Sequence, residues 1–131
     1  HGCQSLKNIS SLKNWDVSNG IDFSDMFSEC KALLDISALI NWNVSHGEDF
    51  SLMFDSCETL RDVTTFYNWN VFNGKNFWAM FRYCFNLKKF YLPNTLNFLM
   101  QDMFEYCNPN LKIHWKYKVY TYEDLIEYQE F

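Results

Sequence analysis

A repeat of 27 residues is the feature that most constrains how this chain can fold. The stretch NWDVSNGIDFSDMFSEC at residues 14–30 returns as NWNVSHGEDFSLMFDSC at 41–57 and as NWNVFNGKNFWAMFRYC at 68–84. A fixed period of this length is typical of architectures in which each unit is too small to bury its own apolar face and must stack on its neighbours. We therefore predict a stack of similar units with a continuous core.

The repeats indicate one domain, residues 1–131, because only four glycines and two prolines interrupt the chain and no linker is evident. We place full repeats at about 3–29, 30–56 and 57–83, a shortened repeat at 84–106 and a C-terminal cap at 107–131. In the cap, LKIHWKYKVY has the alternation of a strand, and TYEDLIEYQEF begins like a capped helix. His1 falls inside a repeat, so we expect that the chain is a fragment of a longer repeat protein.

A stripe of four apolar residues near the end of each repeat predicts a short helix, because the residues are spaced as i, i+3, i+4 and i+7. In the first repeat the stripe is Phe23, Met26, Phe27 and Cys30, and in the shortened repeat it is Met100, Met103, Phe104 and Cys107. Asp22, Asp49 and Asn76 precede the first three stripes, where a side-chain oxygen can cap a helix. After each cysteine, two apolar residues such as Leu33 and Ile36 predict one short parallel strand per repeat.

We expect the strictly periodic positions to form the core, because buried positions must stay fixed from one repeat to the next. The expected core residues are Trp15, Trp42, Trp69, Met26, Phe27, Cys30, Met53, Phe54, Cys57, Met80, Phe81, Cys84, Met103, Phe104 and Cys107. The tryptophans could also form a row of platforms for sugar rings. We favour a buried tryptophan ladder that closes a corner of each repeat.

Residues 30–57, CKALLDISALINWNVSHGEDFSLMFDSC, resemble the leucine-rich-type repeats of BspA-like surface proteins and the related repeat domain first described in mycoplasma lipoproteins. The resemblance covers residues 3 to about 107. It implies an α/β fold in the form of a right-handed leucine-rich-repeat-like solenoid, with one short strand and one short helix per repeat and a parallel sheet. It also implies surface binding or adhesion, with no catalytic residues to transfer.

This chain departs from that family pattern at two periodic positions. Glycine stands where the family commonly has a small apolar residue, and phenylalanine stands where it often has methionine. The residues are Gly20, Gly47 and Gly74, and Phe23, Phe50 and Phe77. We expect these changes to alter the packing of the core and not the role of the protein.

Composition argues against several classes of function. The net charge is −5 and the isoelectric point is about 5.0, so we expect no nucleic-acid partner. No apolar run is long enough to span a membrane. The carboxylates have no recurring His or Ser partner, so we predict that the protein is not an enzyme and uses no cofactor.

The five cysteines are interpreted as small buried hydrophobic residues. We expect Cys30, Cys57 and Cys84 to be buried, reduced and stacked; a disulfide between neighbouring repeats or a metal site are the alternatives. Unpaired thiols in an odd number fit a cytoplasmic location, whereas the family resemblance indicates the cell surface. The two indications conflict and leave the location open.

A candidate binding surface follows from the residues that flank the predicted strands and change from repeat to repeat. Its members are Arg61, Lys88, Lys89, Tyr91, Lys112, His114 and Lys116. Basic residues in an acidic chain can attract an acidic protein or glycan, with Tyr91 as an aromatic anchor. The alternative is that the lysines only keep an exposed sheet soluble.

We therefore expect a non-catalytic binding or scaffold module that presents a repeat surface to a protein or glycan partner. The second hypothesis is a structural or assembly subunit whose repeats pack against other chains.

Overall fold

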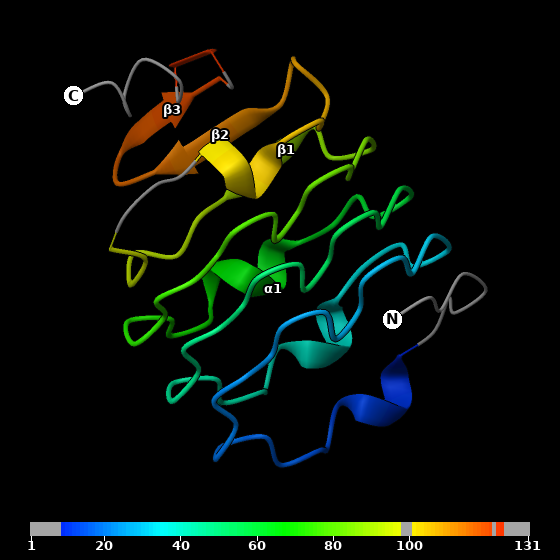
Figure 1. Ribbon diagram of the computed structural model, residues 1–131, viewed down its shortest axis with the longest axis vertical. Helices are drawn as coiled ribbons and strands as arrows, with labels where there is room; N and C mark the ends of the chain where they lie inside the picture. Colours follow the sequence, from blue (N-terminus) through cyan, green and yellow to red (C-terminus); the bar gives the residue numbers. More distant parts are fainter. Residues whose placement is uncertain (1–8, 98–100, 122, 125–131) are drawn as a thin grey trace.

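The computed structural model describes residues 9–97, 101–121, 123 and 124, which form a tall stack of irregular loops with a small sheet at the C-terminal end (Figure 1). The helices of this part are η1 (Ser10–Leu12), η2 (Ser37–Leu39), α1 (Thr64–Tyr67) and η3 (Gln101–Phe104). The strands are β1 (Lys89–Tyr91), β2 (Lys112–Trp115) and β3 (Lys118–Tyr120). The sheet is mixed, because β1 pairs with β2 in parallel and β2 pairs with β3 antiparallel.

Backbone hydrogen bonds join each repeat to the next along the predicted helical stripes. In the first pair of repeats they run from Phe23 N to Asp49 O (2.8 Å), Asp25 N to Ser51 O (3.0 Å), Phe27 N to Met53 O (2.9 Å) and Glu29 N to Asp55 O (2.7 Å). Every second amide therefore donates to the neighbouring repeat, as in a parallel sheet, and not to its own segment as in a helix.

The predicted helices over the first three stripes are thus wrong, whereas η3 covers part of the fourth. The backbone angles give the reason for the first three. Asp25 and Glu29 have φ of 59° and 61°, in the left-handed region that a right-handed helix does not contain. Leu52 and Ser56 repeat this pair in the second repeat, also four residues apart. Successive tight turns with a period of four residues place apolar side chains on one side at nearly the spacing of a helix.

The three predicted helix caps form turns instead. The Oδ1 atom of Asp22 accepts from Ser24 N at 2.9 Å, and Asp49 Oδ1 accepts from Ser51 N at 2.9 Å. Asn76 does the same for the amide two residues later. These are Asx turns, in which a side chain fixes the corner of a loop.

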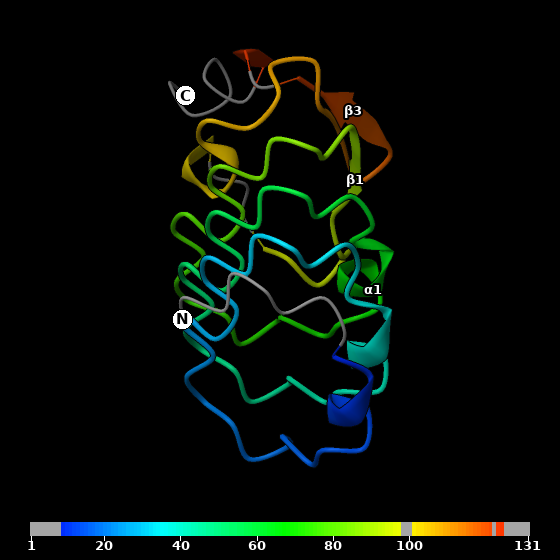
Figure 2. The ribbon, with the colours of Figure 1, turned by 90° about the vertical axis from the view of Figure 1, so that its right-hand side faces the viewer.

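The prediction of one strand per repeat holds only near the C-terminal end. At the earlier positions the described residues contain one parallel bridge, Asp35 to Asp62, and short helices begin two residues after it. These are η2 and α1, and η1 occupies the same place in the first repeat. Figure 2 shows η1, η2, α1 and β1 along one side of the stack and the turn segments along the other.

Stacked phenylalanine rings form the centre of a large, buried aromatic core. Phe50 lies between Phe23 and Phe77, with ring centroids 5.5 Å and 5.3 Å away and interplanar angles of 8° and 3°. A second stack runs through Phe27, Phe54, Phe81 and Phe104. The centroid separations are close to the spacing of neighbouring strands, so the rings repeat with the backbone ladder.

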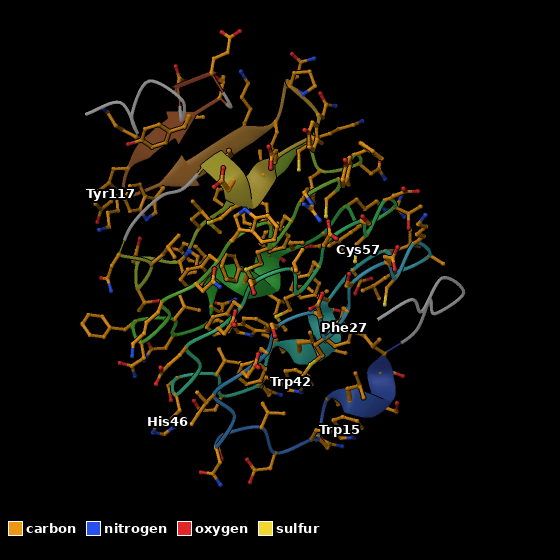
Figure 3. The ribbon with its side chains drawn as sticks, in the orientation of Figure 1. Trp15, Phe27, Trp42, His46, Cys57 and Tyr117 are labelled. Atoms are coloured by element: carbon orange, nitrogen blue, oxygen red, sulfur yellow. The ribbon has the colours of Figure 1, made fainter. Side chains whose placement is uncertain are left out.

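The expected core residues are buried except for Trp15 and Met26, which are exposed, and Cys107, which is partly buried. The indole N–H of Trp42 donates to Leu12 O at 2.9 Å, and Trp69 donates to the equivalent carbonyl of the second repeat at 3.1 Å. Both rings are buried, whereas Trp15 is 59% exposed and Met26 is 37% exposed. The reason is that no described repeat lies beneath the first one, and Figure 3 shows Trp15 at that end of the stack.

The cap also differs from the predicted single strand. The chain reverses at Lys116 and Tyr117, with φ of 48° and 69°, so β2 and β3 form a hairpin and the Tyr117 side chain is exposed. The predicted capping box is present, because Thr121 N donates to Asp124 Oδ2 (2.8 Å) and Asp124 N donates to Thr121 Oγ1 (3.3 Å). Several predicted features lie outside the described residues: His1 and Cys3 at the start of the chain, Met100 in the fourth stripe, and the rest of the predicted terminal helix.

Candidate binding face on the strands

The predicted basic surface lies on the outer face of β1 and β2. Phe90 in β1 points into the core, so Lys89 and Tyr91 on either side of it point outward. The parallel register then places Lys89 beside Lys112 and Tyr91 beside His114. Two residues that are 23 positions apart in the sequence thereby become neighbours on the surface.

One end of this surface is a basic hollow. Arg61, Asn86, Lys88 and Lys89 line a volume of about 250 Å³. The ion pairs within the described residues are Lys31 with Glu58, Lys75 with Glu48, and Arg82 with Asp55, so none of them neutralises these cations. The neighbouring Asp62 carboxylate instead accepts from Thr64 N (3.0 Å) and Thr64 Oγ1 (2.8 Å).

The other end is an aromatic hollow of about 320 Å³, whose wall includes Tyr67, Tyr91, His114 and Tyr117. The Tyr91 and His114 rings stack at 4.5 Å with an interplanar angle of 24°. Tyr67, from α1, meets Tyr91 edge-on at 6.4 Å. These contacts hold an amphipathic wall of rings in one arrangement.

Lysines surround the aromatic rings and interact with their faces. The Nζ atom of Lys89 lies 5.8 Å from the Tyr91 ring centroid, and that of Lys116 lies 4.7 Å from the Trp115 ring. Such contacts position an ammonium group without neutralising it. Asp124 is a nearby carboxylate: hydrogen bonds from Thr121 lower its pKa most, and the charge of Lys112 lowers it further.

The hairpin turn brings Tyr117 to the edge of this surface, and Figure 3 shows its side chain projecting away from the core. Two successive residues with positive φ are typical of a type I′ turn, for which Asn-Gly is the preferred pair. Lys116 and Tyr117 occupy the turn instead. The backbone of Lys116 and Tyr117 is therefore in an unfavourable conformation, at the point where a tyrosine ring and an ammonium group lie at the tip of the hairpin.

The structure brings the predicted residues together as two adjoining groups. Arg61, Lys88 and Lys89 border the basic hollow, with Lys112 beside Lys89; Tyr91, His114 and Lys116 border the aromatic hollow. Sequence reasoning missed Tyr67, Tyr117 and Lys118, which also line the aromatic hollow. Tyr67 replaces Lys13 and Ile40 of the earlier repeats, so a comparison of aperiodic positions could have found it.

The cysteines are structural. Cys57 Sγ donates to Phe27 O at 3.2 Å, Cys84 Sγ donates to Phe54 O at 3.2 Å, and Cys107 follows the same pattern at 3.1 Å. Cys30, Cys57 and Cys84 are buried, as predicted, and Cys107 is partly buried; among the described residues none of the four forms a disulfide. Burial raises the pKa of Cys57 to about 12, so its nucleophilic thiolate form is strongly disfavoured.

No group of three or more His, Cys, Asp or Glu side chains in residues 9–97, 101–121, 123 and 124 is placed to hold a metal ion. Within the same residues no helix has the length and apolar character needed to cross a membrane.

Comparison with known proteins gives one match. Residues 1–115 match the family described as Mycoplasma protein of unknown function, DUF285. No curated protein and no solved structure is similar enough to count as a match. Because the family profile covers most of the 131 residues, the chain belongs to the DUF285 family.

Proposed function

We propose that this chain is a right-handed, BspA-like solenoid whose strand face binds an acidic surface of a partner protein, without catalysis. The solenoid is supported by the backbone bonds between repeats and by the parallel phenylalanine stacks. Its hand is supported by β1 and β2, since a crossover between parallel neighbours in one sheet is nearly always right-handed.

The observation that carries the binding proposal is a set of cations that form no ion pair within the described part of the chain and lie beside a prearranged aromatic wall. Lys89 and Lys112 are paired neighbours in the sheet, and Arg61 and Lys88 adjoin them, in a chain with a net charge of −5. A local excess of one sign steers a partner of the opposite sign. Tyr91, stacked on His114 and bounded by Tyr67, is the aromatic anchor for that partner.

An acidic protein is favoured over a free anion because of the shape of the surface. The basic hollow is open and lies next to the aromatic one, with Lys89 at the border between the two groups. A partner that fills both must carry carboxylates and apolar side chains a short distance apart, as a protein segment does. The adhesion-like role of the BspA-like proteins is compatible with this use of the strand face.

The test reverses two charges while leaving the core untouched. We expect the double variant Lys88→Glu, Lys89→Glu to bind a fluorescent peptide rich in Glu and Phe at least about tenfold more weakly than the unchanged protein, with a smaller dependence on salt. The matched control is Lys13→Glu with Lys75→Glu, which changes the net charge equally but lies in other parts of the stack. Fluorescence anisotropy at low and high salt measures both quantities.

A third variant separates the anchor from the charges. Tyr91→Ala is expected to weaken binding by about thirtyfold, the effect of losing an aromatic hot spot, with little change in the salt dependence. Circular dichroism confirms the fold of each variant. If the Lys88, Lys89 variant kept its affinity and salt dependence, only a role of the lysines in solubility would stand.

A further inference from the structure

An exposed aromatic patch lies on the side of the stack opposite the strands. It consists of Trp78, Tyr83, Phe85 and Tyr106, and three of these side chains are 41% (Trp78), 49% (Phe85) and 58% (Tyr106) exposed. In Figure 2 the turn segments that carry the patch run along the side away from β1 and α1. It is therefore separate from the proposed acidic-protein site.

The core does not require these aromatic residues. The first two repeats build the same turns with Ser24 and Ser51 in the place of Trp78, with Glu29 and Ser56 in the place of Tyr83, and with Lys31 and Glu58 in the place of Phe85. The change to aromatic residues begins in the third repeat and continues at Tyr106. Apolar surface is thus exposed to water where polar residues suffice for folding.

The backbone makes the two tyrosines more unusual. Tyr83 and Tyr106 both have φ of 62°, and Glu29 and Ser56 have φ of 61° at the equivalent turn. The turn fixes this left-handed conformation, which large side chains rarely adopt. Tyrosine at both positions has no advantage for the turn itself and indicates a role for the rings.

The patch is rigid and partly polar. The Tyr83 and Tyr106 rings stack at 4.9 Å with an interplanar angle of 13°, and Phe85 meets Tyr83 edge-on at 5.9 Å. The guanidinium of Arg82 lies 5.1 Å from the Trp78 ring centroid and 5.6 Å from that of Tyr83.

Asp55 fixes Arg82 in this place by a forked ion pair. Arg82 Nε and Nη2 donate to Asp55 Oδ1 and Oδ2 at 3.0 Å and 3.3 Å, and this bond raises the pKa of Arg82. The positive charge beside the rings is thereby neutralised. An anionic ligand gains little from a cation that already has a partner.

Next to the stacked rings lies a hollow of about 340 Å³, lined by Glu105, Tyr106, Cys107 and Pro109. Its volume is at the lower end of the range for small-ligand sites, so it suits a single ring-sized group. Its lining thus combines an aromatic residue, Tyr106, with an acidic one, Glu105.

We infer that this patch binds a neutral sugar, with one pyranose ring stacked on Tyr106 and its hydroxyl groups directed to Glu105. The C–H face of a pyranose is apolar and flat, while its hydroxyl groups both donate and accept hydrogen bonds. A proline-rich segment also stacks on aromatic rings, but proline has no N–H to donate to the Glu105 carboxylate. The combination of ring and carboxylate therefore favours the sugar.

The experiment uses residues that the chain itself places at these turns. Tyr83→Ser introduces the residue found at the equivalent position of the second repeat, and Tyr106→Ser makes the same change in the shortened repeat. Trp78→Ser likewise introduces the serine that the first two repeats have at that position. Phe72→Ser is the matched control, since Phe72 is an exposed aromatic in the place of Ser18 and Ser45 and lies outside the patch. Ser56 shows that serine is compatible with the turn.

The probes are chitotriose, cellotriose and mannotriose, with sialyllactose and a polyproline peptide as competitors of other chemistry. Calorimetry and saturation-transfer NMR are expected to show saturable binding of at least one neutral trisaccharide. The affinity falls at least tenfold in Tyr83→Ser and Tyr106→Ser and stays unchanged in Phe72→Ser. The Lys88, Lys89 double variant retains this binding, which separates the inference from the proposed function.

The inference is overturned by absence of saturable binding to all three neutral sugars. It is also overturned by equal loss in Phe72→Ser, or by preference for sialyllactose or polyproline over the neutral sugars.

Discussion

Replacing Gly47 by Ala tests how the phenylalanine stack depends on its glycines. A Cβ atom at this position would lie 2.4 Å from Phe50 Cζ and 2.9 Å from the carbonyl oxygen of Val44. Phe50 is fully buried between Phe23 and Phe77, so its ring has no free space into which to move. The Val44 carbonyl is held too, because Gly47 N donates to it at 2.8 Å.

The expected loss follows from these contacts. Inserting a methyl group into a packed site typically costs about 1 to 3 kcal/mol. The alanine also restricts the unfolded chain, which returns about 0.4 to 1 kcal/mol where its conformation is compatible. We therefore expect Gly47→Ala to lower the free energy of unfolding by about 1 to 2 kcal/mol. For a chain of this size each kcal/mol corresponds to a decrease in Tm of roughly 3 to 5 °C.

Urea denaturation of a double-mutant cycle with Phe50→Leu measures the coupling. The smaller side chain removes the ring atom that the methyl group meets, so Gly47→Ala is expected to cost little in the Phe50→Leu background, with a coupling of about 1 kcal/mol or more. Gly20→Ala is the comparison, because Phe23 stacks face to face on Phe50 alone among the described rings, whereas Phe50 is stacked on both sides; a smaller loss is expected there. The reasoning would be refuted if Gly47→Ala were neutral, or equally costly with Leu at position 50.

Two further predictions concern the core. Phe54→Ala is expected to lower the free energy of unfolding by about 3 to 5 kcal/mol, since a ring stacked on both sides leaves a cavity; a loss below about 1 kcal/mol in urea denaturation would mean that the stripe faces water. The pKa of Cys57 is about 12 in the folded protein and near 9.0 in the unfolded chain, so the unfolded state loses this proton first as pH rises. The contribution of this thiol to stability is therefore full below pH 9 and falls by up to about 1.4 kcal/mol per pH unit between pH 9 and pH 12. Thermal melts of Cys57→Ala and of the unchanged protein over this pH range check the prediction. If Tm fell with pH at the same rate in both proteins, the prediction would be contradicted.

The core could be predicted from the sequence because burial leaves a periodic signature. Trp42, Phe54 and Cys57 each recur at the same place in the next repeat, and each is buried. Exposed positions are not constrained in this way and vary. The exception, Trp15, has the right residue type for the core but no described repeat beneath it.

The secondary structure could not be predicted with the same success, because two backbone arrangements share one pattern. Apolar residues at i, i+3, i+4 and i+7 fit a helix, and they also fit two tight turns whose left-handed residues are four positions apart. Asp25, Leu52 and Ala79 take that conformation without being glycine, so the usual sign of a positive φ is missing. The hydrogen bonds that decide the matter join different repeats and leave no local signal.

The candidate site was predictable where residues break the period and missed where a turn hides them. Lys88, Lys89 and Tyr91 stand out when the repeats are aligned, and the sheet places them together. Tyr117 lies between two lysines, as an inward-pointing residue of a continuous strand would. The chain reverses there without the Asn-Gly pair that usually indicates a hairpin turn, so the turn was not predicted.

The position of the aperiodic aromatic residues bears on which part of the chain recognises a partner. The first two repeats stack through the same ladder and the same phenylalanine rings as the third. Where the third repeat carries Trp78 and Tyr83, the second carries Ser51 and Ser56 and the first carries Ser24 and Glu29. On the strand side, Ile40 is followed one repeat later by Tyr67. Because the earlier repeats build the same core without them, the core does not account for these aromatic residues on either face. Their position fits the proposal that a partner is recognised at the C-terminal half of the stack, with the earlier repeats as its support.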